Sequence, residues 1–355
     1  MNLKDRILLV SKLGEFLQNL STQNFDSKFD GITVEDYEDF QIQIEETSYK
    51  NAWFIKENIQ HALEAWATNL TASHINSWLN KYPNLKDGVT SPKTVGIVMA
   101  GNIPLVGFHD LLCVFLSGHN AICKLSSDDK ILLPAILRIL SKMNPEINSS
   151  IKLTTGRLEN FEAVIATGSN NTSRYFEYYF GKYPNIIRKN RNSVAILTGK
   201  ESKEELENLG TDIFQYFGLG CRNVSKLYIP QNYDLTQLFE AIQSFEKVQF
   251  QSKYMNNYDF NKSIYLVNKV EHFDNGFCLL KEDQQLVSPI SVIYYEYYND
   301  IKSAVDKITA RRDEIQCVIG KEKLMPDNVL FGESQKPELD DFADGIDTLK
   351  FLLKL

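Results

Sequence analysis

The 355-residue sequence contains no apolar run long enough to cross a membrane or to form the core of a secretory signal. Residues 1–6 are already charged, and the apolar stretch 7–10 is shorter than the roughly 7–15 residues of a signal-peptide core. Positive charge is also scarce, because 46 acidic residues outnumber 38 basic ones and give a net charge of -8. Binding to nucleic-acid phosphates needs a basic surface. We therefore predict a cytoplasmic protein with no stable membrane insertion and no nucleic-acid partner.

Cysteine is rare, and no two cysteines form a Cys-x-x-Cys pair. The five histidines are equally scattered, without the spacing that metal ligands require. This pattern predicts reduced thiols in a reducing compartment and no metal site. The five cysteines are Cys113, Cys123, Cys221, Cys278 and Cys317.

The usual dinucleotide fingerprint Gly-x-Gly-x-x-Gly is absent as well. From Lys93 onward, however, short apolar runs alternate with amphipathic segments, which is typical of a doubly wound parallel α/β sheet. The expected strands are 95–100, 121–125, 151–154, 163–167, 193–197, 226–229, 263–267 and 291–295. The expected helices are 105–116, 131–143, 172–180, 235–245 and 301–308.

The changes of pattern predict four regions. Residues 1–92 form a helical N-terminal layer packed on the cofactor domain, and 93–205 form a dinucleotide-binding domain. Residues 206–328 form a catalytic domain that contains Cys221, and 329–355 form a C-terminal tail.

Cys221 follows a Gly-Leu-Gly turn within the segment 214–229. We expect a helix to begin near Cys221 and a strand to follow. A helix N-terminus lowers the pKa of a nearby thiol, and glycines let a substrate approach the backbone. These features fit a nucleophile, but the segment alone is equally compatible with a small buried residue.

Four separated motifs occur in an informative order: Ala-Gly-Asn-Ile-Pro-Leu (100–105), Cys-Lys-Leu-Ser-Ser (123–127), Thr-Gly-Ser (167–169) and Gly-Leu-Gly-Cys (218–221). Together with Phe-Gly at 331–332 and Asp-Phe-Ala-Asp-Gly at 341–345, they resemble the aldehyde dehydrogenase superfamily. The pattern is most similar to the bioluminescence-type long-chain acyl-CoA reductases, in a short bacterial form. The resemblance extends from about Lys93 to the C-terminus. It implies an aldehyde-dehydrogenase-like fold, with a doubly wound parallel sheet for the cofactor and a second α/β catalytic domain.

The resemblance implies two catalytic residues. Cys221 corresponds to the nucleophile, and Asn102 corresponds to the amide donor that stabilises the thiohemiacetal oxyanion together with the Cys221 N–H. Such a donor contributes on the order of 3 kcal/mol to catalysis. From turn chemistry alone, Asn102 could instead serve only the turn before Pro104.

The resemblance also implies the cofactor-binding residues. Lys124, with Ser126 nearby, corresponds to the segment that reaches the adenine ribose; the alternative is a lysine exposed at a strand end. Ser127 replaces a Glu that often binds the ribose 2′-hydroxyl, which favours NADPH and leaves NADH as the alternative. Asp128 and Asp129 follow directly and would oppose a 2′-phosphate.

Two more positions complete the implied cofactor site. Gly168 and Ser169 correspond to a turn beside the pyrophosphate, although an ordinary helix N-cap by Ser169 or Thr172 explains the same residues. Gln285 stands near Ser288 and Pro289, where related enzymes place a Glu on the nicotinamide ribose.

Arg188 marks a departure from the hydrolytic aldehyde dehydrogenases, which carry a Glu base at the corresponding position. Without that base, water attack on a thioester is slow, so the resemblance implies acyl transfer between thiols. Arg188 itself either attracts CoA phosphates or lies on the surface in a basic run with Lys189 and Arg191.

These features predict an acyl-CoA reductase that forms a Cys-linked acyl-enzyme from a fatty acyl-CoA and reduces it to the aldehyde. Two alternatives remain: a reductase of acyl phosphates with the same fold, and a noncatalytic scaffold that keeps the fold. The sequence also leaves open whether the protein forms a homo-oligomer.

Overall fold

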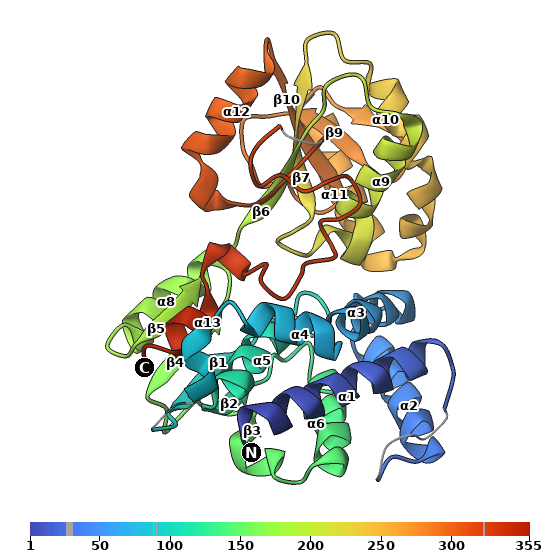
Figure 1. Cartoon of the computed structure of the whole chain (residues 1–355). Helices are drawn as coiled ribbons and strands as arrows, with labels where there is room; N and C mark the ends of the chain where they lie inside the picture. The colour runs from blue at the N-terminus through green and yellow to red at the C-terminus, as the bar shows by residue number, and fades with distance from the viewer. Residues whose placement is uncertain (26–30, 88, 90, 322–323) are drawn as a thin grey trace. The chain divides into compact units, whose positions relative to one another are not determined.

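The chain folds into two compact units in a computed structural model that describes residues 1–25, 31–87, 89, 91–321 and 324–355 (Figure 1). Unit 1 comprises Met1–Lys189 and Glu338–Leu355, and unit 2 comprises Asn190–Pro337. Each unit is built around one β-sheet, as the predicted α/β fold class requires.

Sheet A, the sheet of unit 1, has five parallel strands in the order β3-β2-β1-β4-β5. The winding direction reverses between β1 and β4, as in dinucleotide-binding sheets, which bind their ligands at the carboxyl ends of the strands. The predicted doubly wound sheet is thus confirmed. Its strands are β1 (Thr94–Val98), β2 (Asn120–Lys124), β3 (Ile151–Thr154), β4 (Ala163–Thr167) and β5 (Asn185–Arg188).

Helices surround sheet A, and the buried side chains of the first four helices share one apolar core with its strands. The N-terminal residues are therefore an integral part of unit 1. Its helices are α1 (Leu3–Ser21), α2 (Val34–Lys50), α3 (Lys56–Asn69), α4 (Ala72–Leu79), η1 (Pro83–Asp87), α5 (Phe108–Ser117), α6 (Leu132–Met143), α7 (Ile147–Ser150), α8 (Asn170–Phe180), η5 (Ala343–Gly345) and α13 (Thr348–Leu352).

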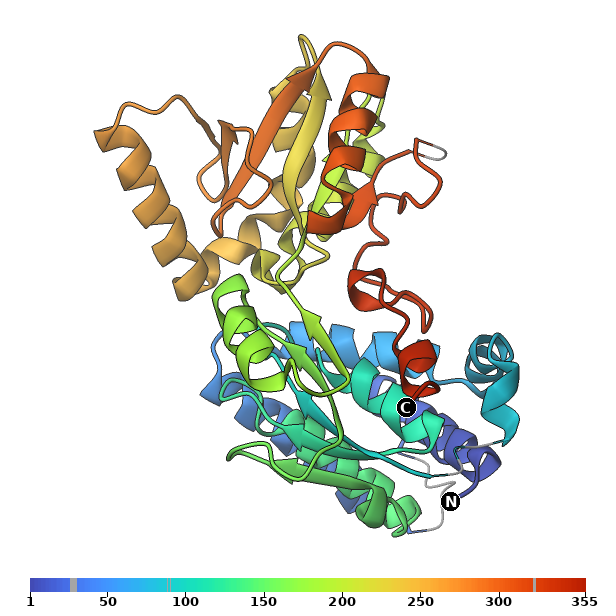
Figure 2. The same cartoon turned by 90° about the vertical axis from the view of Figure 1, so that its left-hand side faces the viewer.

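The C-terminal segment closes unit 1 by packing α13 against α5 (Figure 2). Leu349 and Leu352 are fully buried in the shared core. The Nε2 of His119 donates to the carbonyl of Leu352 over 3.0 Å, while its Nδ1 accepts from the Lys93 N–H. His119, between α5 and β2, thus joins the last helix of the chain to the residue that precedes β1.

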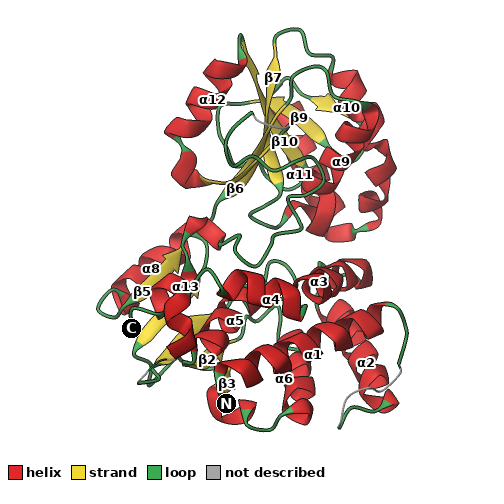
Figure 3. Cartoon of the chain, in the orientation of Figure 1, coloured by secondary structure: helices red, strands yellow, loops and turns green. Residues whose placement is uncertain are grey.

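Sheet B, the sheet of unit 2, has six strands in the order β11-β6-β7-β10-β9-β8, of which only β8 runs antiparallel to its neighbour. Helix α12 lies on one face, and α9 and α10 lie on the other (Figure 3). The strands are β6 (Asn192–Ile196), β7 (Val224–Pro230), β8 (Phe273–Asp274), β9 (Leu279–Glu282), β10 (Val292–Tyr298) and β11 (Ile315–Ile319). The helices are α9 (Lys203–Phe214), η2 (Gln215–Gly218), α10 (Leu235–Ile242), η3 (Gln243–Phe250), α11 (Ser252–Val267), α12 (Ile301–Ala310) and η4 (Arg312–Glu314).

The strand predicted at 263–267 is wrong, because these residues form the last turns of α11. The buried residues of α11 are Tyr254, Tyr258, Asn261 and Tyr265, which follow helical spacing. Leu266 and Val267 are exposed. The apolar residues at this exposed helix end have the composition of a short strand, but tertiary packing overrides their β-propensity.

The division between the units also differs from the predicted ranges. The boundary predicted after residue 205 falls inside α9, and β6 belongs to unit 2 because it pairs with β7 and β11. The predicted tail 329–355 is shared, since Glu338–Leu355 return to unit 1.

Candidate active site

The predicted residues of unit 1 lie after the carboxyl ends of three neighbouring strands of sheet A. Asn102 lies in the loop after β1, and Lys124 ends β2. Ser126 and Ser127 follow Lys124, while Gly168 and Ser169 follow β4. Since β2, β1 and β4 are adjacent and parallel, the fold brings all six residues to one edge of the sheet, where doubly wound folds bind dinucleotides.

Gly101 allows the Asn102 loop to approach the loop after β2 closely. A Cβ at residue 101 would lie 2.3 Å from the Ser126 Oγ, so only glycine fits. In the same turn Leu105 adopts a left-handed φ of 57°. Its N–H donates to Asp129 Oδ2 over 3.2 Å, which fixes the turn against the start of α6.

Asp129 joins the loop after β1 to the start of α6. It is buried, and its second oxygen accepts from the Leu132 N–H over 3.3 Å. Burial raises the pKa of this carboxyl group. Asp129 therefore supports backbone N–H groups of the loop and of the helix start, whereas Asp128 is exposed.

The N-terminus of α8 lies directly after β4. Ser169 is the N-cap residue, and its Oγ accepts from the Thr172 N–H over 3.2 Å, which confirms the capping explanation. A Cβ at Gly168 would lie 2.9 Å from the Phe176 ring. The close packing leaves backbone N–H groups of a helix start at the carboxyl edge of the sheet, a favourable place for a phosphate.

In unit 2, Cys221 follows a strained turn. Tyr216, Phe217 and Gly218 have successive φ values of 53°, 58° and 76°, and the left-handed region is rare for bulky side chains. Such strain costs on the order of 1–3 kcal/mol per residue and is concentrated at functional sites. The strain lies just before the predicted nucleophile.

Cys221 is the least buried of the five cysteines, all of which belong to the described part of the chain. Burial raises the pKa values of the Cys113, Cys123 and Cys278 thiols. Cys317 is buried as well. Accessibility therefore favours Cys221 as the reactive thiol. The helix predicted to begin near it is absent, because a turn leads directly into β7 at Val224.

Two residues that the sequence analysis missed hold this turn. Asn223 is 2% exposed, accepts from the Gly220 N–H over 2.8 Å, and donates to the carbonyls of Asp212, Ile213 and Gln215. The Oγ of Ser193 donates to the Cys221 carbonyl over 3.0 Å and accepts from the Cys317 N–H. A polar Asn at the entry to a buried strand was the available signal for Asn223; Ser193 gave none.

Residues on both sides of the Cys221 turn line a pocket within unit 2. Its volume, which includes the solvent at its mouth, is about 410 Å³. Phe217 and Val224 flank the turn, and Phe214, Tyr254 and Cys278 add apolar or aromatic wall.

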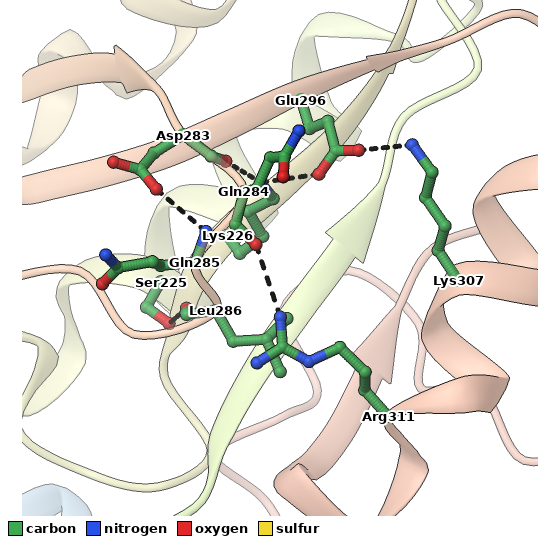
Figure 4. Close-up of polar contacts among 9 residues, drawn as sticks. All are labelled: Ser225, Lys226, Asp283, Gln284, Gln285, Leu286, Glu296, Lys307 and Arg311. Atoms are coloured by element: carbon green, nitrogen blue, oxygen red, sulfur yellow. Dashed lines mark hydrogen bonds and ion pairs between the residues drawn. The ribbon is translucent and has the colours of Figure 1, made fainter.

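Gln285 lies in the loop after β9 and is exposed (Figure 4). Its N–H donates to Asp283 Oδ1 over 2.9 Å. Cys221 and Gln285 thus belong to unit 2, whereas Asn102, Lys124 and the other predicted residues belong to unit 1.

Arg188 ends β5 and is only 3% exposed. Its Nη2 donates to Asp110 Oδ1 over 2.7 Å and to Thr348 Oγ1 over 2.8 Å. Both explanations offered by the sequence are therefore wrong, since Arg188 is neither a surface residue nor open to a CoA phosphate. It joins β5 to α5 and α13 inside unit 1.

Within the described residues, no group of three or more His, Cys, Asp or Glu side chains could hold a metal ion. No described helix is both long and apolar enough to span a bilayer.

Several solved structures that resemble this chain are aldehyde dehydrogenases. Aldehyde dehydrogenase 21 from Physcomitrella patens, in complex with the product succinate, aligns with a TM-score of 0.69 at 14% identity and covers 100% of this chain and 84% of that one. An aldehyde dehydrogenase from Mycobacterium tuberculosis complexed with NAD+ aligns with a TM-score of 0.63 at 11% identity, covering 91% and 74%. The NAD+ complex of an aldehyde dehydrogenase from Bacillus cereus aligns with a TM-score of 0.61 at 12% identity and covers 91% of this chain and 72% of that one. The chain therefore has the aldehyde dehydrogenase fold.

A sequence profile of the acyl-CoA reductase (LuxC) family matches residues 5–236. The chain belongs to this family, and it is accordingly an oxidoreductase of the acyl-CoA and aldehyde class. The match begins at residue 5, so the N-terminal helices are part of the family region, contrary to the expected start near Lys93. No curated protein matches the sequence.

Proposed function

We propose that the protein reduces an acyl-CoA, preferably a fatty one, to the aldehyde through an acyl-enzyme on Cys221. The observation that carries this proposal is the turn before Cys221. Its backbone is strained, the buried side chain of Asn223 holds it by hydrogen bonds, and it leads to the most accessible thiol. A merely structural cysteine would not need this support.

In the first half-reaction, the Cys221 thiolate attacks the carbonyl carbon of the acyl thioester, and the bond from that carbon to the CoA sulfur breaks. Asn102 and the Cys221 N–H stabilise the oxyanion. CoA leaves as a thiolate. In the second half-reaction, reduction of the acyl carbonyl gives a thiohemiacetal, which releases the aldehyde and regenerates the Cys221 thiolate.

The reductant we propose is a nicotinamide cofactor, which supplies a hydride when bound. The strand order of sheet A, the close approach at Gly101 and the α8 N-terminus fit a dinucleotide. Solved structures of this fold include NAD+ complexes. In this proposal unit 1 binds the cofactor through Lys124, Ser126, Ser127, Gly168 and Ser169, and unit 2 supplies Cys221 and Gln285.

We expect NADPH to be preferred, because Ser127 stands at the position where related enzymes often carry a Glu on the ribose 2′-hydroxyl. Ser127→Glu should lower the ratio of kcat/KM for NADPH to that for NADH at least tenfold, about 1.4 kcal/mol, by repelling the 2′-phosphate. Ser127→Gln, of equal size but neutral, is the matched control and should change the ratio much less. A wild type that already favours NADH would refute the assignment.

The aromatic wall that Phe214, Phe217 and Tyr254 give the unit 2 pocket supports an acyl group as part of the substrate. The five cysteines form no disulfide, which fits a cytoplasmic enzyme. The proposal is tested by supplying acyl-CoAs of graded length with NADPH or NADH and following cofactor oxidation by absorbance. Aldehyde formation from acyl-CoA is expected. Activity on acyl phosphates without activity on acyl-CoAs would identify the other reductase class, and no activity with an unlabelled Cys221 would indicate a scaffold.

A further inference from the structure

The loop that carries Gln285 is fixed by side chains from other parts of unit 2 (Figure 4). Three backbone carbonyls around Gln285 each accept a hydrogen bond from a distant side chain. The pairs are Lys226 Nζ with Asp283, Arg311 Nη1 with Gln284 at 3.4 Å, and Ser225 Oγ with Leu286 at 2.7 Å. The loop is therefore held on both sides of Gln285 by β7 and by the residue that follows α12.

Lys226 is unusual among these donors because its side chain is 0% exposed. Burial lowers its pKa, and removing an ammonium group from water costs several kcal/mol. Its Nζ lies 3.1 Å from Glu296 Oε2 on β10, and the Tyr228 ring centroid lies 5.4 Å away. An apolar side chain would fill this space without that cost, so the polar contacts of Lys226 require an explanation.

Glu296 provides a fixed anchor for Lys226. Partial burial alone would raise the pKa of Glu296, but hydrogen bonds from Lys307 and Lys226 lower it below its usual range. Lys226 thus bridges a carboxylate on β10 and the Asp283 carbonyl in the loop. Lys307, by contrast, is half exposed and contacts the carboxylate from α12.

Gln285 is left available at the centre of this arrangement. Its side-chain amide is exposed and has no hydrogen-bond partner among the described residues, while its N–H is fixed to Asp283. Holding the backbone on both sides reduces the conformational entropy that the loop loses when Gln285 binds a ligand. Only the amide of Gln285 then remains to be ordered.

We propose that Lys226 is a positioning residue that holds the 283–286 loop so that Gln285 can hydrogen-bond a ribose hydroxyl of the nicotinamide cofactor. The inference rests on the proposed function, in which Gln285 contacts that ribose. Lys226 itself is buried and does not touch the cofactor.

The test separates cofactor binding and hydride transfer from acylation. Lys226→Met should weaken binding of NADPH, measured by its fluorescence, or slow single-turnover reduction on the order of tenfold. Acylation of Cys221 in the absence of cofactor should keep its rate. Lys226→Arg, which retains a charged donor, should recover most of the loss. Lys307→Met removes the other lysine of Glu296 and is the matched control that should leave cofactor binding unchanged.

A double-mutant cycle with Gln285→Ala decides whether Lys226 acts through Gln285. If it does, the double variant Lys226→Met with Gln285→Ala should lose no more cofactor binding than the more impaired of the two single variants. Additive effects, or an equal loss in acylation, would overturn the inference. If Lys226→Met does not fold, Ser225→Ala replaces it in the cycle. Ser225→Ala should cause a smaller loss of cofactor binding, and this loss should again be non-additive with that of Gln285→Ala. A wild type that neither binds nor oxidises NADPH would overturn the proposed function itself.

Discussion

Asp212 connects the support of the Cys221 turn with a segment distant in sequence. Its backbone carbonyl accepts from Asn223, and its carboxylate accepts from the N–H groups of Gly332 and Ser334 over 2.7 and 3.0 Å. Burial raises the pKa of Asp212 to about 6 in spite of these bonds. The Asp212 carboxyl group therefore binds its proton more tightly in the folded protein than in the unfolded chain.

The raised pKa gives a pH dependence of stability with a definite sign. Between about pH 4 and pH 6 the folded protein binds more protons than the unfolded chain, so the free energy of unfolding falls as pH rises through this window. The total contribution is on the order of 3 kcal/mol. Asp212→Asn, which is neutral throughout, should lower stability but lack this part of the slope.

Urea unfolding at several pH values measures the effect. Asp259→Asn, a change at an exposed carboxylate of α11, is the matched control and should retain the wild-type slope. Equal slopes in the wild type and Asp212→Asn would show that Asp212 is already ionised at low pH in the folded protein.

The residues that hold the site could be predicted only where their partners are local. The cap at Ser169 follows from its bond to Thr172, three positions away. Arg188 was misjudged because its partners Asp110 and Thr348 are 78 and 160 positions distant. Asn223 was missed because its acceptors are backbone carbonyls at the end of α9, which only the fold brings near.

At the level of elements, continuous apolar runs made β1 and β4 predictable, since these central parallel strands are buried on both faces. Strand β5, a four-residue strand at the sheet edge that ends in the charged Arg188, was not predicted. The prediction of a helix at Cys221 was wrong because a turn and a helix start contain the same small and polar residues.

Helix α13 contacts the buried ion pair of Arg188 and Asp110 through Thr348, and we expect this ion pair to be essential for the stability of unit 1. Arg188→Leu leaves the Asp110 carboxylate buried without its charged partner and should lower the free energy of unfolding by about 3–5 kcal/mol. Thr348→Val removes one neutral hydrogen bond and should cost about 1 kcal/mol.

Denaturant unfolding provides the measurement. Lys189→Leu changes the adjacent basic residue, whose pair with Glu177 is exposed, and should cost less than about 1 kcal/mol. If Arg188→Leu were no more costly than this control, the ion pair would contribute nothing to stability. Arg188→Leu combined with Asp110→Asn should regain part of the loss.

At the scale of the whole molecule, the sequence correctly predicted the aldehyde dehydrogenase fold and the acyl-CoA reductase family. Motif order made this possible, because each motif alone has an ordinary structural explanation. The extent of the family region was underestimated, because the helices of residues 1–92 carry no catalytic motif. Their side chains pack in the same core as sheet A, which only the structure shows.

The central claim is that Cys221 carries the acyl group in an intermediate that water does not cleave. The decisive measurement is intact-protein mass spectrometry with peptide mapping after addition of acyl-CoA without reduced cofactor. We expect one acyl group on Cys221, none in Cys221→Ala, slow decay in buffer and rapid release by free CoA, because Arg188 is buried and cannot act as a base. An acyl group on Cys113, Cys123, Cys278 or Cys317, or rapid release of free fatty acid in buffer alone, would contradict the account.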